Sequence, residues 1–204
     1  MSEHAFPASG ARIFCIGRNY AEHAREMRAE TPPEPVIFMK PSSSCLGPGA
    51  VPFPAGHGQV DFEGELVFEL SGDLSAPIRA AGLGVDLTLR DRQAELKAKG
   101  LPWETAKAFE GSALLGPRVA LQSATLGDLS FRLLLNDQLR QQGQASEMIF
   151  SPEELVRALS VFWTPRAGDL LFSGTPSGVG PLQPGDEIFM DSPQLGSAVW
   201  QLQQ

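Results

Sequence analysis

The stretch Val60-Asp61-Phe62-Glu63-Gly64-Glu65-Leu66-Val67-Phe68-Glu69-Leu70 decides the expected fold, because apolar and acidic residues alternate along most of it. A period of two residues is typical of a β-strand with one apolar and one polar face. On such a strand Glu63 and Glu65 point to the same side, roughly 6.5 to 7 Å apart along the backbone. Carboxylates at this spacing can converge on one hard cation, which prefers oxygen ligands. Taken alone, the stretch favours the simpler interpretation of an edge strand that displays a solvated acidic face.

Gly64 stands between the two glutamates, where packing in a strand gives no reason for glycine. Such a glycine indicates a bulge or the close approach of another segment. The whole chain of 204 residues has 21 glycines and 17 prolines, spread between apolar runs. This distribution predicts many short strands joined by turns. The length predicts one well-buried domain over residues 1–204.

Charge and composition exclude several classes of partner. The formal net charge is −8 and no cluster of Lys and Arg is present, which argues against nucleic acid as a partner. No apolar run approaches the roughly 18 residues of a membrane span, and the N-terminus lacks the pattern of a secretion signal. Cys15 and Cys45 have no metal-like spacing and are expected to be reduced and buried. The simplest expectation is a cytoplasmic protein.

The remaining pattern predicts an α+β, mainly β fold. Asn19 is the expected N-cap of the first helix, and Asn136-Asp137 is the expected turn of a hairpin. Ser151-Pro152-Glu153-Glu154 has the pattern of a capping box. Residues 41–59 and 105–109 are expected to be irregular. The other expected strands and helices are, in order, strands at 12–16, 36–40, 83–87, 131–135, around 139, 169–172, 187–190 and 198–202, and helices at 18–27, 88–100 and 151–161.

Two further stretches carry candidate functional groups. His23 and Glu26 are spaced as neighbours on one helix face, where a carboxylate can orient an imidazole as a general base. Taken alone, this spacing favours a surface salt pair. Residues 173–180 form a Gly-rich turn whose backbone N–H groups can face an anion. The turn lacks the Gly-Lys-Ser/Thr of a P-loop, so it does not support nucleotide binding.

Together these segments resemble the fumarylacetoacetate hydrolase family, and most closely its acylpyruvase/oxaloacetate decarboxylase branch. The resemblance covers roughly residues 12–196 and depends on several motifs in the same order. These motifs are Gly17-Arg18-Asn19-Tyr20 with His23 and Glu26, Phe38-Met39-Lys40-Pro41, Glu63-Gly64-Glu65-Leu66, Asp86-Leu87-Thr88-Leu89-Arg90-Asp91-Arg92-Gln93, Lys99-Gly100-Leu101-Pro102-Trp103 with Lys107, Met148-Ile149-Phe150-Ser151, and Gly174-Thr175-Pro176-Ser177-Gly178-Val179-Gly180.

The resemblance implies a mixed β roll with a few short helices, a homodimer, and a site built at matching positions. The implied ligands of a divalent metal, Mg²⁺ or Mn²⁺, are Glu63, Glu65 and Asp86. The implied catalytic residues are the water-activating pair His23 and Glu26, with Lys107 and Gln93 lining the substrate site. The less securely matched substrate-binding positions are Arg90, Lys40, Thr175 and Gly174.

The implied substrate is a small 2-oxo acid that chelates the metal through its 1-carboxylate and 2-oxo oxygen. In an acylpyruvate, water deprotonated by His23 and Glu26 would attack the 4-carbonyl. Cleavage of the C3–C4 bond would leave a pyruvate enolate that the metal stabilises. Loss of CO₂ from oxaloacetate gives the same enolate without the water step.

Three alternatives differ in what the site does. Relatives with the same metal site isomerise or decarboxylate 2-oxo dienoic diacids of the 2-hydroxyhepta-2,4-diene-1,7-dioate type in aromatic catabolism. A non-catalytic metal-binding paralogue would have lost the water-activating groups, but His23, Glu26, Gln93 and Lys107 are all present. A glycosidase would need carboxylates on opposed sides of a sugar, which neighbours on one strand face cannot easily supply.

Overall fold

The computed structural model describes residues 10–26, 32–121 and 126–204, and it confirms the α+β, mainly β fold. The largest sheet has seven strands in the order β2-β1-β12-β6-β7-β9-β3. Its strands in chain order are β1 (Ile13–Gly17), β2 (Val36–Lys40), β3 (Cys45–Leu46), β6 (Gly64–Leu70), β7 (Ile78–Asp86), β9 (Ala113–Ala120) and β12 (Leu170–Phe172).

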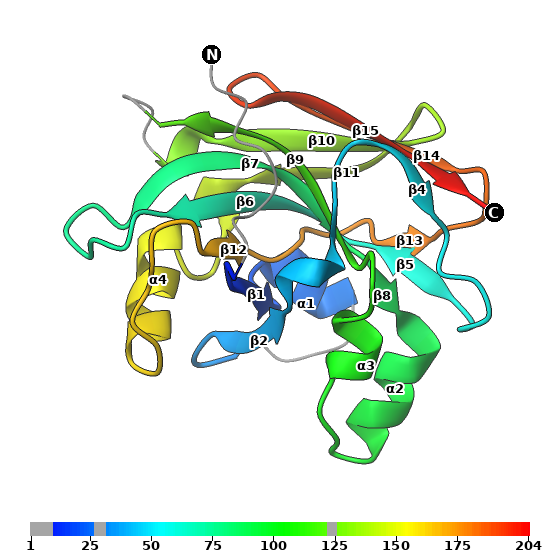
Figure 1. The fold of residues 1–204 in the computed structure, drawn as a ribbon, viewed down its shortest axis with the longest axis horizontal. Helices are drawn as coiled ribbons and strands as arrows, with labels where there is room; N and C mark the ends of the chain where they lie inside the picture. The colour runs from blue at the N-terminus through cyan, green and yellow to red at the C-terminus, as the bar shows by residue number, and fades with distance from the viewer. Residues whose placement is uncertain (1–9, 27–31, 122–125) are drawn as a thin grey trace.

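Two smaller sheets complete the β structure. A five-stranded sheet has the order β11-β10-β14-β15-β4, and a three-stranded sheet has the order β13-β5-β8. Their strands are β4 (Gly49–Pro52), β5 (Val60–Phe62), β8 (Thr88–Leu89), β10 (Ser130–Leu135), β11 (Gln138–Gln144), β13 (Gly180–Pro181), β14 (Glu187–Ser192) and β15 (Gly196–Gln203). In Figure 1 the five-stranded sheet lies above the curved strands β6, β7 and β9. One apolar cluster fills the space between them, with Leu66 and Leu83 on one side and Leu133 and Trp200 on the other.

Short helices flank these sheets. The α-helices are α1 (Ala21–Glu26), α2 (Arg90–Ala98), α3 (Glu104–Lys107) and α4 (Pro152–Ser160), and the 3₁₀ turns are η1 (Ser42–Ser44), η2 (Leu126–Asp128) and η3 (Ala145–Glu147). Figure 1 shows α2 and α3 side by side at one end of the molecule and α4 at the other. None of the helices in the described ranges has the length and apolar character that a bilayer crossing requires.

The acidic stretch lies inside the molecule, so the interpretation as a solvated edge strand is wrong. The stretch is divided at Glu63 into β5 and β6, because β5 pairs with β8 and β13 whereas β6 pairs with β7 and β12. Strand β6 is the fourth of the seven strands, and every residue of β5 and β6 is buried. The expected close approach at Gly64 is confirmed, since a Cβ there would lie 2.7 Å from Leu133 Cδ1.

Elements defined by local residues agree with the sequence. The hairpin turns at Asn136 and Asp137 with φ of 50° and 63°, values that asparagine and aspartate tolerate. The capping box of α4 is present, with Ser151 and Glu154 bonded reciprocally. Gly100 follows α2 with φ +62°, the left-handed backbone that ends many helices.

Other expectations about local structure are wrong. Residues 41–59 contain η1, β3 and β4, and β4 pairs in parallel with β15 from the far end of the chain. Helix α3 overlaps the segment 105–109 that was expected to be irregular, and α2 begins at Arg90 rather than 88. Helix α1 begins at Ala21, so Asn19 does not cap it, and the expected end of this helix at 27 lies outside the described residues. The Asn19 amide instead donates to the carbonyl oxygens of Phe150 and Ser173.

Candidate active site

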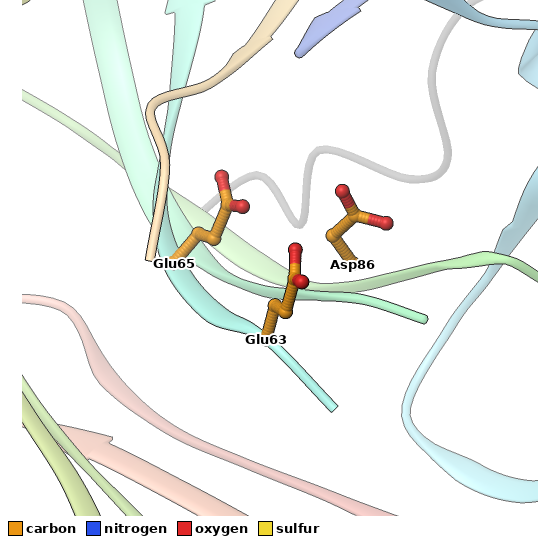
Figure 2. Close-up of side chains that lie close together, drawn as sticks. All are labelled: Glu63, Glu65 and Asp86. Carbon is orange, nitrogen blue, oxygen red and sulfur yellow. The ribbon is translucent and has the colours of Figure 1, made fainter. Parts of the chain in front are cut away.

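Three carboxylates converge in the interior at the ends of neighbouring strands. Glu63 lies between β5 and β6, Glu65 lies on β6, and Asp86 ends β7. Figure 2 shows the three side chains pointing toward one another. One oxygen of each lies within 4.8 Å of those of the other two, and each residue is 7% exposed or less. The predicted ligand residues are therefore adjacent, in a donor set of oxygens that suits Mg²⁺ or Mn²⁺.

The negative charges of the cluster are only partly balanced by the protein, which favours the binding of a cation. Burial, together with the negative charges of Asp86 and Glu63, raises the pKa of Glu65 well above its ordinary value. Burial acts on Glu63 in the same direction, but Lys107 and Arg90 outweigh it and hold the pKa of Glu63 below its ordinary value. Without a metal, the protein thus neutralises Glu63 and disfavours the negative charge of Glu65. A divalent cation would remove this deficit of positive charge.

Lys107 ends α3 and spans two of the predicted ligands. Its Nζ donates to Glu63 Oε2 (2.6 Å), Asp86 Oδ2 (2.9 Å) and Thr88 Oγ1 (2.6 Å). All three donors of the ammonium are therefore used. The negative charges of Asp86 and Glu63 outweigh the effect of burial and raise the pKa of Lys107, so the group stays cationic.

Lys40 contacts Asp86 and the end of α3, but it does not line the pocket described below. It is 1% exposed, and its Nζ lies 2.9 Å from Asp86 Oδ1. The same ammonium donates to the carbonyl oxygens of Lys107 and Ser112. Lys40 therefore fixes the end of α3 and the predicted ligand Asp86, in contrast to the expected contact with substrate.

The predicted pair of His23 and Glu26 is formed on α1. His23 Nδ1 lies 3.3 Å from Glu26 Oε2, and Glu26 also accepts hydrogen bonds from the backbone N–H of Gly178. A carboxylate at Nδ1 favours the tautomer with the proton on that nitrogen. The lone pair of Nε2 is then left to act as a base. His23 is 6% exposed and lines the same pocket as Glu63, whereas the Glu26 side chain is 38% exposed, so only the histidine of the pair is buried.

Arg90, at the start of α2, connects the predicted ligand Glu63 to Gln93. Its guanidinium donates to Glu63 Oε1 (2.8 Å), Gln93 Oε1 (2.8 Å) and Asp61 Oδ2 (2.7 Å). Since arginine cannot accept a hydrogen bond, the Gln93 oxygen must face it, and the Gln93 amide N–H groups remain for the pocket. Asp61 was not predicted as a site residue. Its place in the acidic alternation of the strand was the one available signal.

Asp61→Asn is expected to weaken the ion pair that positions Arg90, without removing a predicted metal ligand. An asparagine oxygen can keep one hydrogen bond but loses the charge that holds the guanidinium. We expect a fall in kcat/KM of about tenfold for a 2-oxo acid, with Mn²⁺ affinity changed less than about threefold. Steady-state kinetics beside Mn²⁺ titration measures both. An unchanged kcat/KM would show that Arg90 does not need Asp61.

The Gly-rich turn binds the protein's own carboxylates. Gly174 N–H donates to Glu65 Oε2 (2.7 Å), and the Thr175 hydroxyl donates to the Gly64 carbonyl oxygen (2.8 Å). Gly174 has φ +95°, and a Cβ there would lie 2.8 Å from Asn19 Cβ. Thr175 lines the pocket, whereas Gly174 acts through Glu65. Gln141, which sequence reasoning missed, holds both Gly64 and Thr175.

A pocket of about 170 Å³ lies between several of these groups. It is lined by Ile16, Gly17, Arg18, His23, Phe38, Glu63, Arg90, Gln93, Lys97, Trp103, Lys107 and Thr175. Sequence reasoning missed the contributions of Arg18, Phe38, Lys97 and Trp103. A larger open groove along β10 and β11 has neither His23 nor the carboxylate cluster in its lining, so the smaller pocket is the candidate substrate site.

Comparison with known proteins agrees with this geometry. Residues 12–203 match the family described as fumarylacetoacetate (FAA) hydrolase C-terminal. The chain is 38% identical to the oxaloacetate tautomerase of Escherichia coli strain K12 over 195 residues, which cover 90% of this chain and 88% of the relative. It is 35% identical to the mitochondrial oxaloacetate decarboxylase of Dictyostelium discoideum over 196 residues, 90% of this chain and 89% of the relative.

A solved structure is similar in both fold and sequence. The fumarylpyruvate hydrolase from Pseudomonas aeruginosa, in complex with Mn²⁺ and pyruvate, has a TM-score of 0.87 and 32% identity, covering 94% of this chain and 89% of that chain. The predicted resemblance is confirmed on sequence, fold and the convergence of three carboxylates. This chain belongs to the fumarylacetoacetate hydrolase family of enzymes.

Proposed function

We propose that this enzyme uses Mg²⁺ or Mn²⁺ to act on small 2-oxo acids, hydrolysing the C–C bond of acylpyruvates, decarboxylating oxaloacetate, or both. The proposal depends on one pocket lined by Glu63, Lys107 and His23, with Glu26 next to His23 and with Glu65 and Asp86 beside Glu63. The named activities of the relatives all concern oxaloacetate or a substituted pyruvate, which supports the same substrate class.

Hydrolysis and decarboxylation would use the protein's groups differently, because only hydrolysis needs an activated water molecule. The ion held by Glu63, Glu65 and Asp86 would supply Lewis-acid chemistry. In hydrolysis His23 Nε2 takes a proton from water, the water oxygen bonds to the 4-carbonyl carbon, and the C3–C4 bond breaks. Protonation at C3 then gives pyruvate and a carboxylic acid. Decarboxylation of oxaloacetate breaks the C3–C4 bond without water, and Lys107 keeps positive charge beside the developing enolate in both reactions.

A two-substrate assay tests the proposal. Acetylpyruvate and oxaloacetate are incubated with enzyme and Mn²⁺ or Mg²⁺, and again with excess EDTA, while enol absorbance and pyruvate are followed separately. We expect metal-dependent formation of pyruvate from at least one substrate. Loss of enol absorbance without pyruvate would show a tautomerase, an activity that the sequence did not predict but that one relative bears by name. Absence of any metal-dependent change would contradict the proposal.

His23→Gln is expected to slow hydrolysis of acetylpyruvate much more than decarboxylation of oxaloacetate. Removing the base should slow acetylpyruvate hydrolysis by about 10²- to 10⁴-fold, the usual contribution of general base catalysis. Oxaloacetate decarboxylation, which has no water step, should fall by less than about tenfold. His57→Gln is the matched control, because His57 is exposed and lies outside this pocket. Equal loss of both rates would remove the assigned role of His23.

The organisation of the protein is also part of the proposal. We infer a single catalytic domain over residues 1–204, supported by the apolar cluster shared between the sheets. A cytoplasmic location is supported by the free, buried Cys15 and Cys45. A homodimer is supported by the family resemblance, and light scattering coupled to size-exclusion chromatography measures it.

A further inference from the structure

Two cations in the wall of the pocket have no role in holding the carboxylate cluster. Arg18 follows β1 and Lys97 lies on the last turn of α2, and both line the pocket. Within the part of the chain that the structure describes, no carboxylate forms an ion pair with either of them. Arg90 and Lys107, in contrast, are paired with Asp61, Glu63 and Asp86. The pocket therefore presents positive charge that its own acidic residues do not neutralise.

The positive charge of Lys97 is disfavoured by burial of its ammonium and by the neighbouring cations. Lys97 is an exposed residue, and its Nζ lies 5.1 Å from the centroid of the Trp103 ring. Burial of the ammonium, and then the positive charges of Arg90 and Arg18, lower the pKa of Lys97 to about 8. Repulsion of this kind is relieved when an anion binds between the cations.

The backbone at Arg18 is also unusual. Its φ is 62°, and the other non-glycine residues with positive φ in the described ranges are Asn136 and Asp137 of the hairpin turn. A left-handed arginine outside such a turn costs free energy, and conformations of this kind concentrate at binding sites. Substrate binding by the Arg18 side chain would account for this cost.

We propose that Arg18 and Lys97 form a subsite for a second carboxylate, so that the pocket prefers 2-oxo diacids to 2-oxo monoacids. This inference rests on the proposed function, which directs the 1-carboxylate and 2-oxo group toward Glu63, Glu65 and Asp86. A second carboxylate is repelled by that acidic cluster and is attracted by the unpaired cations of the wall. Phe38 and Trp103 line the same pocket and suit the short carbon chain of such a substrate.

The pocket volume limits the diacid to a small molecule. About 170 Å³ is well below the roughly 300 Å³ at which pockets for drug-sized ligands begin. The matched probes are therefore 2-oxoglutarate and 2-oxopentanoate, which have the same five-carbon chain and differ only in a terminal carboxylate or methyl group. Neither carries a 3-carboxylate or a 4-carbonyl, so neither offers the bond that the proposed reactions break.

Calorimetric titration of the Mn²⁺-loaded enzyme tests the subsite without turnover. The wild type is expected to bind 2-oxoglutarate about tenfold more tightly than 2-oxopentanoate, a factor expected for charge-assisted hydrogen bonds that are partly screened. Lys97→Met and Arg18→Gln should each reduce that preference to about threefold or less, leaving the affinity for 2-oxopentanoate unchanged. Lys99→Met is the matched control, because Lys99 pairs with the exposed Glu95 outside the pocket, and it should keep the preference. Melting temperatures establish that each variant is folded.

The outcomes separate the subsite from the proposed reaction. Equal affinity of the wild type for both probes, or no detectable binding of either, overturns the subsite even if acetylpyruvate is hydrolysed. Equal weakening of both probes in the variants also overturns it, because the cations would then hold the shared 1-carboxylate. A preference for the diacid that the variants lose supports the subsite, even if acetylpyruvate and oxaloacetate are not turned over.

Discussion

Glu65→Gln is expected to lower turnover of both acetylpyruvate and oxaloacetate severely by removing a predicted metal ligand. The glutamine oxygen can still accept the hydrogen bond that Gly174 N–H donates to Glu65 Oε2. The other half of the amide then directs N–H donors toward Glu63 and Asp86, where a cation would bind. We expect Mn²⁺ affinity to fall at least about 100-fold and turnover on the order of 10³-fold.

The same substitution should stabilise the metal-free protein at neutral pH. The folded-state pKa of Glu65 is raised above its ordinary value of 4.5, so ionisation of this residue costs the folded state free energy. In the wild type this cost appears as the pH rises above about 4.5 and grows until the raised pKa is passed. Glu65→Gln should lack this loss of stability.

Titration with Mn²⁺ and melting curves with and without metal measure both effects. Glu95→Gln is the control, because Glu95 is exposed and pairs with Arg92 on α2 and with Lys99 just after it. A variant that keeps wild-type Mn²⁺ affinity, or that melts at a lower temperature than the metal-free wild type, would contradict the assignment of Glu65.

The parts of the fold that could be predicted are those whose cause lies within a few residues. The Asn136-Asp137 turn, the capping box of α4 and the glycine after α2 need only local backbone geometry and one or two hydrogen bonds. The division of the acidic stretch at Glu63 could not be predicted, because it depends on whether β13 or β12 pairs alongside. These strands lie about a hundred residues further along the chain, and a strand pattern does not name its partner.

The candidate site shows the same distinction. The predicted ligands and the His23–Glu26 pair were assigned through the family resemblance, because they lie in short motifs that match it, whereas their spacing alone favoured surface groups. Asp61, Gln141 and Thr88 accept hydrogen bonds from Arg90, the Gly64 N–H and Lys107, respectively. Each pair joins two different elements, so these contacts exist only after folding. Lys40 lies in a family motif, but burial behind Asp86 decides its role, and the sequence alone does not give that burial.

Lys107→Met is expected to give a protein that gains more stability from Mn²⁺ than the wild type does, while losing turnover. The buried ammonium bonds Glu63, Asp86 and Thr88. Removing it takes one of two cations from each carboxylate, leaving Glu63 with Arg90 and Asp86 with Lys40. Breaking a buried ion pair from one side costs about 3–5 kcal/mol, so the metal-free variant should melt well below the wild type. A divalent ion restores part of the missing charge, so it should raise the melting temperature of the variant by more than that of the wild type.

Turnover should still fall on the order of 10²- to 10³-fold, because the positive charge beside the developing enolate is gone. Melting curves across an Mn²⁺ series and steady-state rates at saturating metal measure the two effects, with Lys99→Met as the exposed control. An equal rise in melting temperature for the variant and the wild type would show that Lys107 does not balance the charge of the metal site, and retained turnover would exclude it from the reaction.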